Sequence, residues 1–379
     1  MAGSRYEQSM KSIVFIITTL RRTGPVNILF DLVKYLDRSV YKPHIITLCE
    51  EEGDSRWREF EADGVSLERL NLPRGWRFPM ASGRIKTMMA EIQPAAIHCI
   101  GFRADLIGAI HLGQYRKVSS QLNYPFDDYV LTYGKVIGGM MAHLTTWALK
   151  RYDVTIACAN DVAVKMQCKG VPARVIYNAI DDTRFVPPNA QERLAQRQYL
   201  SLWPDAKLVF IFVGTLSDRK QPLVALQAFL RFQALHPKSA MLVLGEGPLS
   251  EECKQLVDGI RVVFFGNVPD TRPYLAASDI YIATSKAEGM PVSVLEAMAM
   301  KLPILLSDIE PHREILAIDS EAGLLASTGS VDDTAQTMLK LAQKNLPSMG
   351  AHSRQIIDNA LNSKVMSMRF QKIYCELTS

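Results

Sequence analysis

Long apolar runs, paired cysteines and blocks of like charge are all missing from this chain of 379 residues. No apolar run approaches the roughly 18 residues of a membrane span. The longest run near the start, residues 13–20, lacks the small-residue cleavage site of a signal peptide. The net charge is only +4, with basic and acidic residues interspersed, so nucleic acid is not an expected partner. We therefore expect a cytoplasmic protein.

Metal-binding patterns are also missing. No cysteine forms a Cys-x-x-Cys pair or a metal-ligand spacing with histidine, and most lie within apolar runs, which predicts buried free thiols in a reducing compartment. The cysteines are Cys49, Cys99, Cys158, Cys168, Cys253 and Cys375. Two adjacent acidic pairs, Asp127-Asp128 and Asp181-Asp182, stand in loop-like contexts and are interpreted as solvated turns. The sequence thus predicts no metal site and no cofactor.

What the chain does have is a regular alternation of short β-rich runs with helical stretches, which is typical of a parallel sheet covered on both faces. The predicted strands of a first series are 12–19, 44–49, 95–100, 118–122, 154–159 and 174–177, and those of a second series are 207–213, 240–244, 261–265, 279–284 and 302–306. Residues 178–196 interrupt the alternation and are expected to link the two series. The predicted fold class is α/β, with two Rossmann-like domains facing across a cleft.

The expected domain boundaries follow from this division. Residues 1–180 form the N-terminal domain, and residues 181–355 form the C-terminal domain. Residues 356–379 are expected to form a C-terminal helix, with packing back on the N-terminal domain as one arrangement open to it.

A predicted turn between a buried strand and a helix lies at residues 213–222. Pro222 is expected near the first helical position. Gly214 permits close approach of a ligand to the backbone, and Lys220 adds a positive charge where the amides at a helix N-terminus already favour anions. The combination predicts a diphosphate-binding turn.

A second turn of the same kind lies at residues 284–291, again after a strand and with Pro291 in the first turn of the next helix. Glu288 lies in the loop, and Glu296 follows eight residues later, about 12 Å away if the segment is helical throughout. That separation suits the distance from a nucleotide's ribose to the sugar beyond its pyrophosphate. Carboxylates at both ends would accept hydrogen bonds from pairs of hydroxyl groups.

The run Glu-Gly-Met-Pro-x-x-x-Leu-Glu-Ala that contains these two glutamates resembles the signature of retaining glycosyltransferases of the GT-B fold, family-4 type (glycosyl transferases group 1). Segments 177–181, 244–248 and 265–268 are similar to family segments in the same chain order. The resemblance implies a transferase that moves a sugar from a nucleotide diphosphate sugar, with UDP as the expected nucleotide, to a glycan or lipid-linked oligosaccharide. It also implies retention of the anomeric configuration, no metal requirement and a place in bacterial surface polysaccharide synthesis, including lipopolysaccharide.

Site residues are carried over from the same resemblance. Glu288 and Lys220 would be catalytic, with Glu288 on the transferred sugar and Lys220 on the leaving pyrophosphate. The implied donor-binding residues are Gly24, Gly214, Thr215, Arg219, Lys220, Gly245, Asn267, Val268, Glu288, Gly289, Met290, Pro291 and Glu296. The C-terminal domain would then bind the nucleotide sugar and the N-terminal domain the acceptor.

The chain departs from the family pattern in two places. The family usually has an arginine directly after the first glycine of the 213–222 turn, where this chain has Thr215, so Arg219, Arg21 or Arg22 is a candidate replacement. Many members have a His-x-His pair at the end of an N-terminal strand, of which only His98 is present. His98 is therefore either near the reacting sugar or a histidine of the core.

Acceptor binding is expected in the N-terminal half, where a polar and aromatic loop spans residues 123–129. The candidate acceptor-binding residues are His98, Asn123, Tyr124 and Asp127. Residues 69–77 and 140–151 mix basic with large apolar side chains, which suits either packing inside the domain or peripheral contact with the inner face of the cell membrane. Two other functions remain open: a sugar-nucleotide epimerase of the same fold and a non-catalytic nucleotide-sugar-binding protein.

Overall fold

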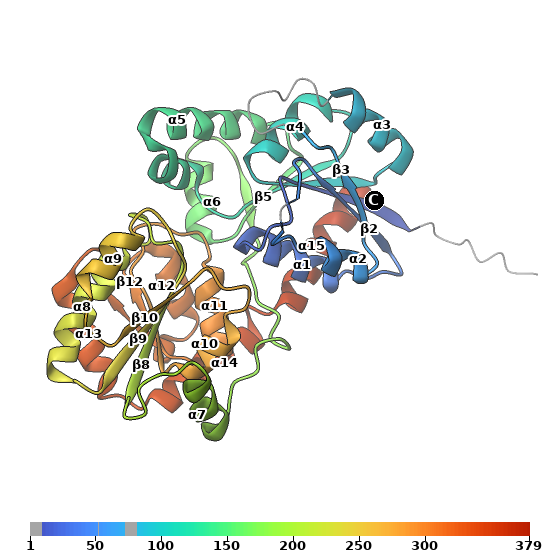
Figure 1. The fold of residues 1–379 in the computed structure, drawn as a ribbon. Helices are drawn as coiled ribbons and strands as arrows, with labels where there is room; N and C mark the ends of the chain where they lie inside the picture. The colour runs from blue at the N-terminus through green and yellow to red at the C-terminus, as the bar shows by residue number, and fades with distance from the viewer. Residues whose placement is uncertain (1–9, 52, 73–81) are drawn as a thin grey trace, which may run out of the picture.

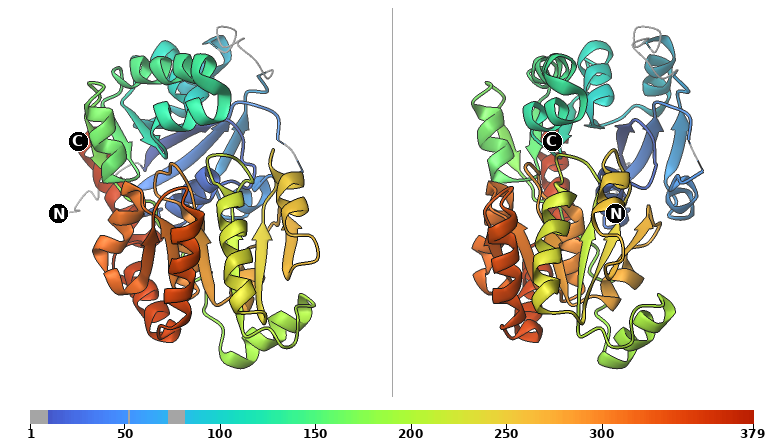
Figure 2. Two further views of the ribbon diagram at one scale, coloured as in Figure 1. Left: turned by 90° about the vertical axis from the view of Figure 1, so that its left-hand side faces the viewer. Right: turned by 60° about the vertical axis from the view of Figure 1, so that its left-hand side comes forward.

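The structure is a computed structural model that describes residues 10–51, 53–72 and 82–379. It contains two α/β halves, each with a parallel sheet between layers of helices (Figure 1). Figure 2 shows from two further sides that the halves are stacked one on the other. The predicted fold class is confirmed. Within the described ranges, no helix is long and apolar enough to cross a membrane.

The N-terminal half is built on a seven-stranded sheet in the order β3-β2-β1-β4-β5-β6-β7. Its strands are β1 (Lys11–Ile17), β2 (Tyr41–Thr47), β3 (Ser66–Arg69), β4 (Ala96–Ile100), β5 (Lys117–Gln121), β6 (Val154–Ala157) and β7 (Ala173–Val175). Its helices are α1 (Gly24–Lys34), α2 (Trp57–Ala62), α3 (Ser82–Ile92), α4 (Phe102–His111), α5 (Pro125–Leu149) and α6 (Asn160–Gln167). All strand pairs are parallel, and β4 and β5 are buried along their whole length, as helices on both faces require.

The C-terminal half is built on a six-stranded parallel sheet in the order β10-β9-β8-β11-β12-β13. Its strands are β8 (Leu208–Val213), β9 (Ser239–Leu244), β10 (Val262–Gly266), β11 (Ile280–Ala283), β12 (Ile304–Ser307) and β13 (Gly323–Ala326). Its helical elements are α7 (Ala190–Tyr199), α8 (Pro222–Leu235), α9 (Ser250–Leu256), α10 (Arg272–Ala277), α11 (Val292–Ala299), α12 (Glu310–Ile318), η2 (Ser320–Ala322), α13 (Val331–Ala342) and α14 (Leu346–Asn359). Because β8 and β11 are neighbours, the loops that follow them meet at one edge of the sheet.

The chain passes between the halves twice, and the two crossings lie side by side. The backbone N–H of Ile180 donates to the carbonyl of Leu361 at 3.0 Å, and the N–H of Ser363 donates to the carbonyl of Ile180 at 3.0 Å. After the second crossing, helix α15 (Ser363–Thr378) packs on α1 and β4 of the N-terminal half. Figure 1 shows α15 beside α1. The last helix of the chain is thus part of the first half.

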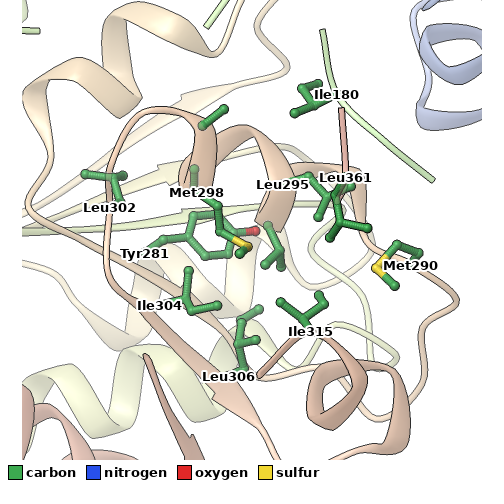
Figure 3. Close-up of a cluster of buried hydrophobic side chains, with 14 of the residues drawn as sticks. Ile180, Tyr281, Met290, Leu295, Met298, Leu302, Ile304, Leu306, Ile315 and Leu361 are labelled. Atoms are coloured by element: carbon green, nitrogen blue, oxygen red, sulfur yellow. The ribbon is translucent and has the colours of Figure 1, made fainter. Parts of the chain in front are cut away.

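One apolar core continues through the C-terminal half to the crossings. Figure 3 shows Tyr281 and Ile304 of neighbouring strands packed beneath Leu295 of α11, with Ile180 and Leu361 at one end of the cluster. All five side chains are at most 2% exposed. The cluster therefore holds α11, which carries one of the predicted site glutamates, firmly on the sheet.

Several details differ from the sequence-based expectations. The last part of the predicted linker, from residue 190 on, is helical, because Asn189 and Glu192 form a reciprocal capping box that starts α7. The short strands β3 and β13 were not predicted. Cys168 and Cys375 are exposed, whereas the other four cysteines are buried thiols. Of the segment 69–77, residues 73–77 lie outside the described residues.

Candidate active site

Two loops at the carboxyl edge of the second sheet, residues 214–221 and 284–291, lie against each other and are called the corner loops below. The backbone N–H of Lys286 donates to the carbonyl of Arg219 at 2.8 Å, and the Thr284 hydroxyl donates to the carbonyl of Gln221 at 2.8 Å. An ion pair of 2.6 Å between Lys286 and Asp218 adds a side-chain link. The two turns predicted from the sequence therefore lie against each other, and their shared role in binding a ligand stays a prediction.

Glu288 lies where the corner loops meet and has two cationic partners. Lys220 Nζ lies 2.5 Å from one carboxylate oxygen, and a guanidinium nitrogen of Arg219 lies 3.0 Å from the other. The Glu288 side chain is only 5% exposed. Burial alone would raise the pKa of Glu288, but the two cations and hydrogen bonds from Lys220 and Ser285 outweigh it and lower the pKa to about 2. Glu288 is thus ionised at neutral pH.

Glu296, the second glutamate of the motif, is buried in α11 and has no cationic partner as close as those of Glu288 among the described residues. One of its oxygens accepts a hydrogen bond of 2.8 Å from the Thr271 hydroxyl. Burial raises the pKa of Glu296 to about 7, against the effect of that hydrogen bond. The helix begins only at Val292, so the segment between the glutamates is half loop and not helical throughout.

Gly245, outside the corner loops, allows close packing against the 214–221 loop. A Cβ at Gly245, whose φ is +118°, would lie 2.1 Å from the carbonyl oxygen of Gly214. A Cβ at Gly214 would lie 3.4 Å from Lys220 Cε. A side chain at Gly245 would displace the 214–221 loop, whereas a Cβ at Gly214 would come into ordinary contact with Lys220.

The loop after Glu288 touches the N-terminal half. The backbone N–H of Gly289 donates to Asn123 Oδ1 at 2.8 Å, and the carbonyl of Met290 accepts from the Asn178 side chain at 2.9 Å. A Cβ at Gly289 would lie 2.1 Å from the carbonyl oxygen of Leu122. These two backbone groups, which were expected to face sugar and phosphate, are engaged by asparagines in the structure. Pro291 is the N-cap residue of α11 and lies one position earlier than expected.

The remaining donor-binding candidates lie around this contact. Gly24 begins α1, and a Cβ there would meet Val292 of α11 at 3.7 Å. Asn267 and Thr215 are exposed, and Val268 is half-buried against the main apolar core. Nothing in the structure tests their predicted contacts with a nucleotide, which stay predictions.

A cleft of about 690 Å³ opens in the N-terminal half at the carboxyl ends of β1, β4 and β5. Helix α5 forms one wall through Tyr129, Tyr133 and Ile137. The cleft reaches the corner loops at two residues of its lining: Asn123 accepts from Gly289, and Asp128 lies 3.7 Å from Arg219 Nε. The geometry therefore joins a cavity of the first half to the charged loops of the second.

Two sequence models of known protein families match this chain. The sequence model "Glycosyltransferase Family 4" matches residues 22–184, and "Glycosyl transferases group 1" matches residues 207–344. The chain is a GT-B glycosyltransferase of the family-4 type.

Relatives agree with this assignment. An uncharacterized glycosyltransferase of Methanocaldococcus jannaschii is 28% identical over 77% of this chain and 75% of its own. The Escherichia coli UDP-Gal:alpha-D-GlcNAc-diphosphoundecaprenol alpha-1,3-galactosyltransferase is 26% identical over 54% of each chain. The Anabaena HepE structure in complex with UDP and glucose superposes with a TM-score of 0.81 at 17% identity, covering 97% of this chain and 100% of that one, which supports the fold.

One of the three candidate replacements for the arginine missing at Thr215 pairs with Glu288. Arg219 pairs with Glu288 and lies near Asp128. Arg21 lines the cleft but pairs with Asp54, and Arg22 pairs with Glu59 of α2. The structure therefore favours Arg219 among the three candidates.

The acceptor candidates of the glycosyltransferase are only partly brought together. Asn123 lines the cleft, whereas Tyr124 and Asp127 do not and instead contact Lys165 on the far side of the loop. His98 is 1% exposed, and its ring nitrogens bond the hydroxyls of Tyr374 and Ser120, each at 2.7 Å. Burial lowers the pKa of His98 to about 3, so the geometry favours the interpretation as a core histidine.

Two aspartates were misread from the sequence. Asp128 lies in the first turn of α5 and not in a solvated turn. Pro125 at the first helical position could have predicted that a helix begins there. Asp181 is fully buried and bonds Lys34 and Tyr35 at the C-terminal end of α1, so it is not a solvated turn either. Among the described residues, no cluster of histidine, cysteine and carboxylate side chains has the arrangement of a metal site.

Proposed function

We propose that this glycosyltransferase moves a sugar, with retention of its anomeric configuration, from a nucleoside diphosphate to a hydroxyl group of a glycan or lipid-linked oligosaccharide. The observation that carries the proposal is the ionised Glu288, held by Lys220 and Arg219 where the cleft meets the corner loops. A carboxylate there accepts hydrogen bonds from hydroxyls of the transferred sugar. Retention rests on the family resemblance of the Glu288–Glu296 run.

The reaction breaks the bond between the anomeric carbon and the diphosphate oxygen and forms a bond from that carbon to the acceptor oxygen. The acceptor proton passes to the departing phosphate oxygen, so the diphosphate leaves with the electron pair and the proton. Lys220 and Arg219 supply fixed positive charge for the diphosphate as it leaves. We infer on this ground that the transfer needs no metal ion, which activity in the presence of EDTA would test.

UDP is the proposed nucleotide. The Escherichia coli relative is named for a UDP-galactose donor, and the Anabaena structure was determined with UDP and glucose. Glu296 is the proposed partner of the ribose hydroxyls, because it is a buried carboxyl group on the helix that follows the 284–291 loop, with the Thr271 hydroxyl as its neighbour.

A lipid-linked acceptor is favoured by the exposed face of α5. After the helix is broken at Gly134, Val136, Met140 and Trp147 follow at helical spacing and are 84%, 46% and 41% exposed. Their neighbours Ile137 and Met141 line the cleft. An apolar face that continues into the cleft suits peripheral contact with the inner face of the cell membrane and delivery of a membrane-borne acceptor, as bacterial surface polysaccharide synthesis requires.

The test begins with a screen of UDP-, GDP- and ADP-sugars for thermal stabilisation, because a ligand bound only by the native state raises its melting temperature. Sugars that stabilise are then offered as donors to octyl glycosides of glucose, galactose and N-acetylglucosamine. NMR of the product gives the anomeric configuration. We expect stabilisation by UDP-sugars, transfer with retention, and slow donor hydrolysis without an acceptor. An inverted product would disprove retention, and conversion of the donor into its epimer would replace transfer by epimerisation.

A further inference from the structure

Gln121, which no part of the sequence analysis assigned, ends strand β5 and lines the cleft. It is 4% exposed and lies two residues before Asn123, the residue that touches the Gly289 backbone. Two residues of extended chain span about 7 Å. Gln121 therefore lies on the floor of the cleft close to the point where the two halves of the site meet.

The side-chain amide of Gln121 has a fixed orientation. Its nitrogen donates to Asp105 Oδ2 at 2.9 Å and to Ser119 Oγ at 2.9 Å. A carboxamide nitrogen has two hydrogens, so both are used on the side away from the cleft. Within the described ranges, no group donates to Gln121 Oε1. The residue thus presents a hydrogen-bond acceptor alone to the cavity.

Asp105 is the group that fixes this orientation. It is fully buried in the first turn of α4, where the positive end of the helix dipole stabilises a carboxylate. Its other oxygen accepts from the Ser119 hydroxyl at 2.6 Å. Burial raises the pKa of Asp105 to about 7, although the hydrogen bonds from Ser119 and Gln121 act in the opposite direction. Burying a carboxyl group without a cationic partner, as Asp105 is among the described residues, lowers the stability of the fold. Its position directly behind Gln121 suggests that Asp105 is kept there to orient the Gln121 side chain.

We propose that Gln121 Oε1 binds a hydroxyl group of the acceptor sugar and that Asp105 is a positioning residue that keeps this oxygen turned toward the cleft. The acceptor class that fits is a sugar with a free hydroxyl directed at the floor of the cleft. A sugar with hydrogen or an ether at that position finds an oxygen without a donor and binds more weakly. This inference rests on the proposed transfer function and adds a specificity determinant to it.

The test combines acceptor analogues with substitutions. Transfer to the octyl glycoside that wild-type protein uses best is compared with transfer to each of its monodeoxy analogues. In the wild type, we expect one deoxy position to raise the acceptor KM by about 10- to 100-fold, the range of a lost hydrogen bond at a buried site. In Gln121→Met, which matches the glutamine in length, we expect that single penalty to disappear. The donor KM and donor hydrolysis stay unchanged. Gln167→Met, at an exposed position of α6, is the matched control.

Gln121→Met removes a hydrogen-bond donor from the buried Asp105 carboxylate and lowers stability. A second variant, Asp105→Asn, therefore tests the same proposal. In Asp105→Asn the new amide donates to Gln121 Oε1, the glutamine turns over, and its N–H groups face the cleft. We expect the same deoxy position to lose its penalty, with stabilisation by UDP retained. If Asp105 had only a structural role, its substitution would not change the acceptor preference while leaving UDP binding intact.

Two failures are distinguishable. If wild-type protein neither binds nucleotide sugars nor hydrolyses them, the proposed function is wrong and this inference falls with it. If wild-type protein transfers sugar and every deoxy penalty persists unchanged in Gln121→Met and Asp105→Asn, the transfer function stands and the role of Gln121 is overturned.

Discussion

The corner loops of the C-terminal half and the cleft of the N-terminal half meet at one site but are built differently. In the corner loops, Glu288 is enclosed by Lys220 and Arg219 within 3.0 Å, and all three belong to two short sequence segments. In the cleft, Gln121 and Asp128 come from separate elements and face an open cavity. The difference teaches that positive charge is already in place where the donor's diphosphate is expected, whereas the proposed acceptor recognition depends on single hydrogen-bonding groups.

The largest effect is expected at the centre of the corner loops. Glu288→Gln removes the carboxylate proposed to bind the transferred sugar and leaves Lys220 and Arg219 for the diphosphate. We expect kcat for transfer to fall by about 100- to 1,000-fold while UDP affinity changes little, measured by steady-state kinetics and calorimetry. Glu251→Gln, at an exposed site of α9, is the control. Full activity in Glu288→Gln would show that transfer does not need the Glu288 carboxylate, and the proposed role of the corner loops would then be wrong.

The next effect comes from Lys220, which serves both the glutamate and the proposed diphosphate. Lys220→Met leaves Glu288 with Arg219 as its close cationic partner, so the free energy of unfolding should fall by about 3 kcal/mol in urea denaturation. Transfer and UDP binding should both weaken, with kcat/KM lower by about 100-fold. Lys254→Met, at a surface ion pair, should change neither quantity. A variant with weakened stability and normal UDP binding would limit Lys220 to a structural role.

A moderate effect is expected from pH at Glu296. Because its pKa is about 7 in the folded protein and 4.5 in the unfolded chain, the folded state binds the proton more tightly. Its contribution to stability is therefore present below pH 4.5 and is lost as pH rises through 7, by about 3 kcal/mol in total. Glu296→Gln should flatten this part of the stability–pH curve relative to wild type, measured by urea denaturation from pH 5 to 8.

The same titration bears on nucleotide binding. Ribose hydroxyls donate to an ionised carboxylate, so UDP affinity should rise about 10-fold from pH 6 to 8 in wild type and stay flat in Glu296→Gln. Thr271→Val, which removes only the hydroxyl that bonds Glu296, is the comparison variant. A wild-type affinity independent of pH would place the ribose elsewhere.

The smallest effect is expected at the exposed face of α5. Val136→Ser combined with Met140→Ser should reduce sedimentation with vesicles containing anionic phospholipid by about 3- to 10-fold, because each lost apolar contact weakens membrane binding. Transfer to a water-soluble octyl glycoside should not change. The matched control, Val186→Ser with Leu194→Ser, alters exposed apolar residues far from α5 in sequence. Equal sedimentation of the two double variants would argue against membrane contact through α5.

The fold and the corner loops were readable from the sequence because their signals are local. Strand and helix alternation, Pro222 at the start of α8 and the spacing of Glu288 and Glu296 each lie within a short segment. The short strands β3 and β13 carry weaker signals, and α7 depended on a capping box inside a polar run.

The cleft was less readable because its residues become neighbours only through the sheet. Gln121 stands in the polar run of β5, and nothing local indicates that Asp105 lies behind it. His98 has a family precedent, but its surroundings come from Tyr374, 276 residues away. Contacts of that sequence separation depend on how α15 packs, which a pattern within one segment does not encode.

The position of α15 also decides where this chain can be divided. A fragment that ends at the first crossing would lack Phe370 and Tyr374, which fill the core against β1 and β4, and would leave His98 without one of its two hydroxyl partners. The N-terminal half is consequently completed by the last segment of the polypeptide. Folding of this half therefore requires residues 363–378, and the two crossings, joined by backbone hydrogen bonds, connect it to the C-terminal half.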